Sequence, residues 1–240
     1  MQKNIMQRLI IKRKNPIYLF AFLAVELTAW LCVLFLPVAW VHYLSYSAVA
    51  LSFLFALSLV EIKADTLFAI LGLFFTCIAD YFLVLQKKEG DLLAMCIFLC
   101  AQICYAARTF LISKNKLEKR LQVGIRVLLS VLGALITWLI LREKTGALFI
   151  VSVVYYVNLL CSLVFAFIHF KLPRAKFMAF GLLSFACCDL SIGLHFVADV
   201  FSLPKMHFIR RILRGKKSFV DIFYPPSQAL LGASVYPKYK

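Results

Sequence analysis

Three acidic residues lie inside long apolar stretches of the sequence, where a charged side chain is costly. Glu26, Asp80 and Asp189 each lie within a run of mostly apolar residues. On insertion scales, a carboxylate at the centre of a membrane helix costs about 2.5–3.5 kcal/mol, so such residues usually face the interior of a bundle and serve a function. We interpret Glu26 as a packing residue that is hydrogen-bonded to a neighbour, and the two aspartates as the candidate catalytic pair.

Four other polar side chains are predicted to lie at the depth of the two aspartates. Gln102 and Tyr105 are spaced i, i+3, and Tyr224 and Gln228 are spaced i, i+4, so each pair shares one helix face. Each pair belongs to the span that follows one aspartate along the chain. We therefore expect a polar pocket in which these four side chains bind the substrate. The alternative is a buried polar network that locks the helices together.

Two carboxyl groups in one buried pocket suit general acid–base catalysis. One carboxyl group in its neutral form can donate a proton, while the second, ionised, stabilises positive charge or activates water. Glycosidases divide the work in this way at an oxocarbenium-like transition state. The scheme requires no metal and no cofactor, and the histidines do not show the spacing of metal ligands. The four histidines are His42, His169, His195 and His207.

The composition predicts that these residues lie in a polytopic membrane domain. Of the 240 residues, 63% are apolar and only 16% are charged, whereas soluble domains are typically about 45–50% apolar and ~25% charged. This composition excludes a soluble enzyme, a disordered chain and a secreted disulfide scaffold. A membrane-spanning helix needs ~20 apolar residues. We therefore predict an all-α polytopic bundle of about eight transmembrane helices.

The apolar runs define the boundaries of the predicted spans. The first run extends from Pro16 to Val60, which is too long for one span, and Pro37 is expected to break it. A basic N-terminal segment (1–15) precedes a single transmembrane domain (16–235), and a short tail (236–240) follows it. The predicted spans are 16–36, 40–60, 66–85, 92–111, 123–141, 146–168, 177–198 and 218–235.

The two aspartates belong to a possible internal repeat. Gly72 and Asp80 in the third span match Gly181 and Asp189 in the seventh span, at a constant offset of 109 residues. The two spans are four apart along the chain, so they run in the same direction. The match predicts a parallel four-helix repeat around an axis along the membrane normal. The alternative is a chance match, because glycine and leucine recur often in apolar sequences.

The charge distribution predicts the orientation and the partners of the chain. The sequence has 27 Lys and Arg against 11 Asp and Glu, mostly between the apolar runs. We therefore expect the basic loops to contact anionic lipid head groups, and we expect no binding to nucleic acid. The positive-inside rule places both termini in the cytoplasm. The membrane is predicted to be a bacterial plasma membrane or the endoplasmic reticulum, and the sequence does not indicate an oligomeric state.

Four blocks of the sequence resemble the YhhN family of lysoplasmalogenases, which are multi-pass membrane proteins. The blocks are GLFFTCIADYFL (72–83), FLCAQICY (98–105), GLLSFACCD (181–189) and YPPSQAL (224–230). The resemblance implies that the chain cleaves the vinyl-ether bond of a lysoplasmalogen, which is a lysophospholipid. The products would be a fatty aldehyde and a glycerophospho-alcohol, and Asp80 and Asp189 would be the catalytic residues.

The chain departs from the pattern of this family at several positions. The family usually has His where Gln102 stands, Gly where Ala79 stands and Ser where Cys188 stands, and it commonly has Ala where Ser227 stands. A lysine that is usual near the start of the second span has no counterpart here. Both aspartates are kept, so the resemblance still implies the acid–base pair. The departures lie at positions that the resemblance assigns to contacts with the substrate head group, and they bear on whether the chain is active.

Two other functions fit the same sequence. One is a diverged, non-catalytic member of the family that binds lipid in the membrane. The other is a proton-coupled carrier, in which the buried carboxyl groups relay protons and the repeat supports alternating access. A carrier is expected to have discontinuous helices, and no Gly or Pro interrupts the spans close to Asp80 or Asp189.

Overall fold

The chain forms an all-helical bundle that confirms the fold class predicted from the composition. The computed structural model describes residues 16–36, 38–59, 63–86, 92–141, 146–200 and 219–236, with only the backbone described at 38, 39, 141 and 195–200. Within these ranges the chain forms eight α-helices and no strand. Seven of the helices are long and apolar enough to cross a membrane. The predicted segment 1–15 and residues 237–240 of the predicted tail lie outside the described residues.

The helices follow the order of the predicted spans. Two of them begin four or more residues earlier than predicted, α6 at Lys116 and α8 at Pro173, because their charged first turns are helical as well. Proline is tolerated in the first turn of a helix, where its missing N–H would have no partner. A π-helical segment, η1 (Tyr81–Leu85), continues α4 without a break. The α-helices are α2 (Pro16–Phe35), α3 (Val38–Ser58), α4 (Ala64–Asp80), α5 (Leu92–Ile112), α6 (Lys116–Leu141), α7 (Ala147–Ile168), α8 (Pro173–Val200) and α10 (Phe219–Ala233).

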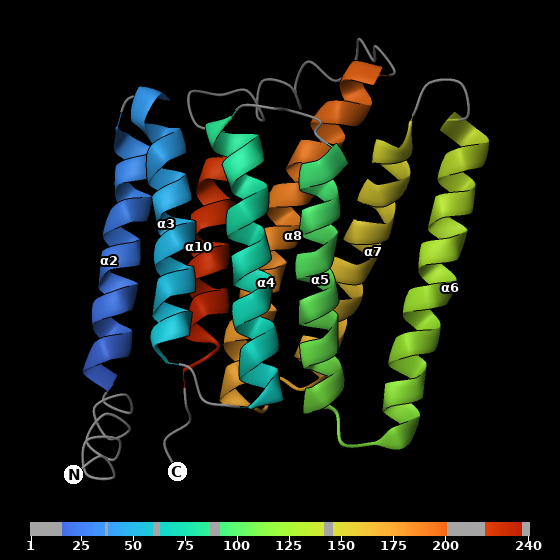
Figure 1. The fold of residues 1–240 in the computed structure, drawn as a ribbon, viewed down its shortest axis with the longest axis horizontal. Helices are drawn as coiled ribbons and strands as arrows, with labels where there is room; N and C mark the ends of the chain where they lie inside the picture. The colour runs from blue at the N-terminus through green and yellow to red at the C-terminus, as the bar shows by residue number, and fades with distance from the viewer. Residues whose placement is uncertain are drawn as a thin grey trace.

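Successive helices run in alternating directions, and α10 lies in the interior of the bundle (Figure 1). It packs against α8, α3, α2 and α4, and it is shorter than the other seven helices. At the edge of the bundle, α6 packs mainly on α7. The first turn of α2 and the last turn of α10 lie at the same end (Figure 1). The membrane side that this end faces remains a prediction.

Two glycines allow close packing in the regions of the predicted repeat. A Cβ atom at Gly72 of α4 would lie 2.6 Å from Cε1 of Tyr105 on α5. A Cβ atom at Gly181 of α8 would lie 3.1 Å from the backbone nitrogen of Leu231 on α10. Glycine therefore brings α4 close to α5 in one half and α8 close to α10 in the other. Because α4 and α8 also run in the same direction (Figure 1), this packing supports the parallel repeat.

The first turns of α4 and α8 meet through an ion pair. Nη1 of Arg174 donates a hydrogen bond of 3.2 Å to Oδ2 of Asp65. The two residues are 109 positions apart, which is also the separation of Asp80 and Asp189. Equivalent positions that contact each other lie on opposite sides of a symmetry axis. The ion pair is consistent with an axis of the predicted repeat between α4 and α8.

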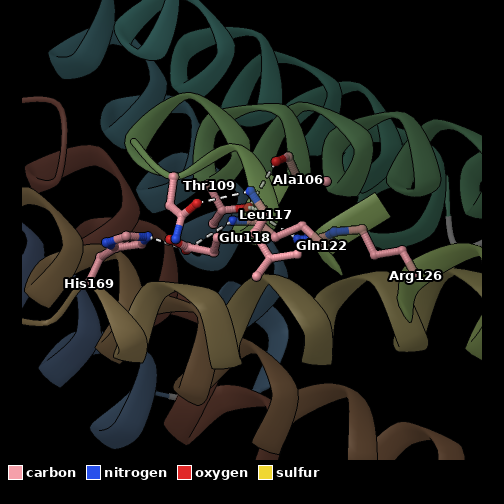
Figure 2. A network of polar contacts seen from close by, with 8 residues as sticks. Ala106, Thr109, Leu117, Glu118, Gln122, Arg126 and His169 are labelled. Carbon is pink, nitrogen blue, oxygen red and sulfur yellow. Dashed lines mark hydrogen bonds and ion pairs between the residues drawn. The ribbon is translucent and has the colours of Figure 1, made fainter. Parts of the chain in front are cut away.

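A separate polar network holds α6 to its neighbours at the end of the bundle where α6 begins (Figure 2). Glu118 of α6 pairs with His169 at 2.6 Å, and Gln122 links Glu118 to Thr109 of α5. Deeper in the bundle, the guanidinium of Arg126 donates to Thr109 on α5 and to Ser162 on α7. The network therefore joins three helices, and the two aspartates take no part in these bonds.

Candidate functional site

Asp80 is buried at the end of α4 and binds a tyrosine from α10. Its side chain is only 2% exposed, and it accepts a hydrogen bond from the hydroxyl of Tyr224. The π-helical segment η1 begins at the next residue. In α10, Pro225 and Pro226 follow Tyr224, so two helical hydrogen bonds are missing there. Irregular helix turns of this kind frequently occur at functional sites.

Asp189 lies on α8 and binds a second tyrosine, from α7. It accepts a hydrogen bond from the hydroxyl of Tyr155, whose side chain is buried. Asp189 itself is half-buried, in contrast to Asp80. The two candidate catalytic residues therefore share one arrangement, a carboxyl group with a tyrosine donor.

The two aspartate–tyrosine pairs are neighbours, joined by the ring of Phe185. The centre of this ring lies 5.6 Å from that of Tyr224 and 6.5 Å from that of Tyr155, and both contacts are edge-to-face. The buried Cys188 is close enough to both carboxyl groups to interact with either charge, and the two carboxyl groups also interact with each other. The structure thus places Asp80 and Asp189 in one site, between α4, α7, α8 and α10.

The amide of Gln102 lies at this site without its own hydrogen bonds. Gln102 is fully buried on α5, next to the hydroxyl of Tyr155. Neither its Oε1 nor its Nε2 has a hydrogen-bond partner among the described residues. A buried polar group without a partner is costly, typically by about 1–3 kcal/mol. The predicted contact of Gln102 with the substrate remains a prediction.

Two of the predicted substrate-binding residues lie further from the carboxyl groups. Tyr105 packs its ring on Gly72, two helical turns before Asp80 on α4, or about 12 Å along the helix axis. Gln228 lies one turn beyond Tyr224, and its Nε2 donates to Ser227 at 3.1 Å. Both side chains are fully buried, and the hydroxyl of Tyr105 and Oε1 of Gln228 have no hydrogen-bond partner among the described residues. Their role in substrate binding remains a prediction.

Tyr155 is the residue of the site that the sequence interpretation did not include. It is one of several aromatic residues in the predicted span 146–168, and its partner depends on how α7 is rotated against α8. The repeat offset offered a signal, because Tyr46 lies 109 positions before Tyr155. Tyr46 is close enough to Asp80 to interact with its charge. In both halves, therefore, a tyrosine from the preceding helix lies near the aspartate.

Glu26, the third buried carboxyl group, lies outside this site. Its Oε1 accepts a hydrogen bond of 2.8 Å from Oγ of Ser52, which joins α2 to α3. Glu26 is 3% exposed, and its other oxygen, Oε2, has no partner among the described residues. The contact supports the interpretation of Glu26 as a packing residue between neighbouring helices.

The fold and the site together define a multi-pass helical membrane protein with a paired-carboxyl site in its interior. Residues 41–235 match the family model described as the YhhN family, so the chain belongs to the YhhN family. The match begins within α3, runs just past the end of α10 and leaves out all of α2. Membership associates the chain with lysoplasmalogenase-like hydrolases at the level of the family. Comparisons with curated proteins and with solved structures find no match.

Proposed function

We propose that the protein is a membrane-embedded hydrolase that cleaves the vinyl-ether bond of a lysoplasmalogen. The observation that carries the proposal is the pair of neighbouring carboxyl groups, Asp80 and Asp189, each bound by a tyrosine hydroxyl. The unpartnered amide of Gln102 lies beside them and offers a contact for the substrate. Family membership supports the same class of reaction.

The reaction proceeds by protonation of carbon followed by addition of water. One aspartate donates its proton to the outer carbon of the vinyl group, which leaves an oxocarbenium ion at the carbon bonded to oxygen. The second aspartate, ionised, stabilises this cation and accepts a proton from the attacking water. The resulting hemiacetal breaks its bond to the glycerol oxygen. The products are a fatty aldehyde and a glycerophospho-alcohol, and atoms balance with one water consumed.

The substrate and the location of the protein follow from this assignment as proposals. A lysophospholipid reaches a site inside the bundle from the membrane, and its alkenyl chain lies among the apolar side chains. The basic loops contact anionic lipid head groups of the same membrane. Both termini face the cytoplasm, in a bacterial plasma membrane or the endoplasmic reticulum.

Two alternatives make different predictions about the same site. A diverged family member binds lysolipid but releases no aldehyde. A carrier moves protons or solute across the membrane, for which helix breaks near the site are expected. The π-helical η1 and the two prolines of α10 flank the Asp80–Tyr224 pair, but both helices continue through them. The continuous helices favour a catalytic site over a carrier.

The proposal is tested by aldehyde release from a lysoplasmalogen by the purified protein. The matched control substrate is a lysolipid with the same head group and chain but a saturated alkyl ether. This compound has no vinyl carbon to protonate, so the proposed reaction releases aldehyde from the vinyl ether alone. Binding of both lipids with no aldehyde from either would support the diverged member instead.

Replacing Gln102 by histidine is expected to change the activity or its pH optimum. The amide lies beside Tyr155 without hydrogen bonds of its own, and histidine introduces a group that titrates near neutral pH. The measurement is the pH–rate profile of aldehyde release for the wild type and Gln102→His. An unchanged profile in a folded variant would show that Gln102 does not contact the reacting groups.

A further inference from the structure

The hydroxyl of Tyr155 is held rigidly against one oxygen of Asp189. It donates to Oδ2, and the Tyr155 side chain is 4% exposed. The ring is held by edge-to-face contacts with Phe98 and Phe185, at centroid distances of 6.0 and 6.5 Å. A tyrosine has few rotatable bonds, and here its neighbours fix them. The position of the hydroxyl is therefore set by the packing of α5, α7 and α8.

This hydrogen bond distinguishes the two oxygens of the Asp189 carboxyl group. Oδ2 is engaged by Tyr155, and no hydrogen bond from the described residues reaches Oδ1. As a residue Asp189 is half-buried, whereas Asp80 is buried. A carboxyl group anchored through one oxygen cannot rotate freely. Its second oxygen then presents its lone pairs in a fixed direction.

A tyrosine also lies at the equivalent position of the predicted repeat. Tyr46 on α3 and Tyr155 on α7 are related by the 109-residue offset, and each lies near the aspartate of the following helix. In the first half, however, Tyr224 of α10 supplies the hydrogen bond to Asp80. Each carboxyl group therefore accepts a hydrogen bond from one tyrosine. The two donors lie on α10 and α7, which are not equivalent helices in the predicted repeat.

We propose that Tyr155 is a positioning residue, which orients the free oxygen of Asp189 toward the reacting atoms. The inference rests on the proposed vinyl-ether hydrolysis and adds a residue that neither the sequence pattern nor the family match assigns to the site. Tyr155 itself does not touch the substrate in this arrangement. It acts by preventing rotation of the carboxyl group, which lowers the cost of reaching the transition-state geometry.

The test compares Tyr155→Phe with Tyr156→Phe, its neighbour on the same helix. Tyr156 is half-buried, and its hydroxyl donates only a long bond of 3.4 Å to the Ala186 carbonyl. For Tyr155→Phe, kcat for aldehyde release is expected to fall about 10- to 100-fold, the effect of losing one hydrogen bond to a charged group. KM is expected to change less than about 3-fold, because substrate contacts remain. Tyr156→Phe is expected to retain both constants.

A spectroscopic measurement tests the contact without activity. Infrared difference spectra identify the carboxyl band that disappears in Asp189→Asn. This band is expected to shift in Tyr155→Phe and to stay in place in Tyr156→Phe. A purely structural role of Tyr155 would change the thermal stability but leave the band unmoved. If Tyr155→Phe does not fold, a ring-fluorinated tyrosine at 155 keeps the packing and changes the acidity of the hydroxyl, so both kcat and the band should still change.

The outcomes distinguish a failure of the role proposed for Tyr155 from a failure of the proposed function. An active wild type with equal kcat for the two phenylalanine variants, or an unmoved band, would overturn the role of Tyr155 alone. A folded wild type that releases no aldehyde from any lysoplasmalogen would overturn the proposed function and this role with it. A fall in kcat together with a shifted band supports both.

Discussion

Asp80→Asn and Asp189→Asn are each expected to reduce aldehyde release by at least ~100-fold. This is the lower range for losing a general acid or base, and the mechanism needs both carboxyl groups in one step. Asparagine is nearly isosteric and still accepts a hydrogen bond from Tyr224 or Tyr155, so the fold and lysolipid binding should persist. The measurement is kcat per folded protein, with folded protein quantified by size-exclusion chromatography and thermal unfolding.

The double variant and a control residue distinguish catalysis from packing. The double aspartate variant should be little worse than either single one, because residues that act as a unit are not additive. Glu26→Gln changes a buried carboxyl group on α2 that bonds Ser52 outside the site, and it should leave kcat unchanged. If the aspartates only lock the helices, stability will fall in both aspartate variants and activity will follow the amount of folded protein.

Gly181→Leu is expected to give the largest loss of stability in the chain. Its Cβ would lie 2.9 Å from Cγ of Leu231 and 3.1 Å from the carbonyl oxygen of Ser227. Two of the three nearest atoms belong to the backbone of α10, so relief requires α10 to move away from α8. Overpacking typically costs about 1–3 kcal/mol, and a larger cost is expected where backbone must shift. Thermal unfolding in detergent measures the effect.

Gly193→Leu is the matched control for this substitution, on the same helix. No atom lies within 4 Å of a Cβ placed at Gly193, and the residue is exposed on the bundle surface. Its substitution is expected to change the unfolding temperature little, because surface changes are usually within about 0.5 kcal/mol. Equal destabilisation by the two leucines would show that α8 and α10 are not closely packed at Gly181.

The helices could be predicted because apolar runs of membrane length are rare in other contexts. The break between the first two helices was anticipated at Pro37, and α2 ends at Phe35 while α3 begins at Val38. The early start of α6 could not be read from hydropathy, because Lys116 and Glu118 are charged. A charged turn at the membrane edge remains helical as long as its side chains reach water or a partner such as His169.

The site was predicted in part because buried carboxyl groups are conspicuous in an apolar chain. The sequence indicated Asp80 and Asp189 by type and depth, and Tyr224 by its place on the following helix. It did not indicate Tyr155, because tyrosine is common in membrane helices and its partner depends on the rotation of α7. For the same reason, the spacing of Tyr105 from Gln102 did not reveal that its ring packs on Gly72. Helix rotation is set by side-chain packing between distant segments, which periodicity alone does not show.

The isotopic composition of the released aldehyde tests the central claim most directly. Purified wild-type protein is given a lysoplasmalogen in D₂O, and the aldehyde is trapped by immediate reduction before its hydrogens exchange. If an aspartate protonates the vinyl carbon, the alcohol formed on trapping carries one deuterium at the carbon next to the former carbonyl, and Asp80→Asn yields at most about a hundredth as much. Aldehyde without that deuterium, or equal yields from the wild type and the variant, would contradict the account.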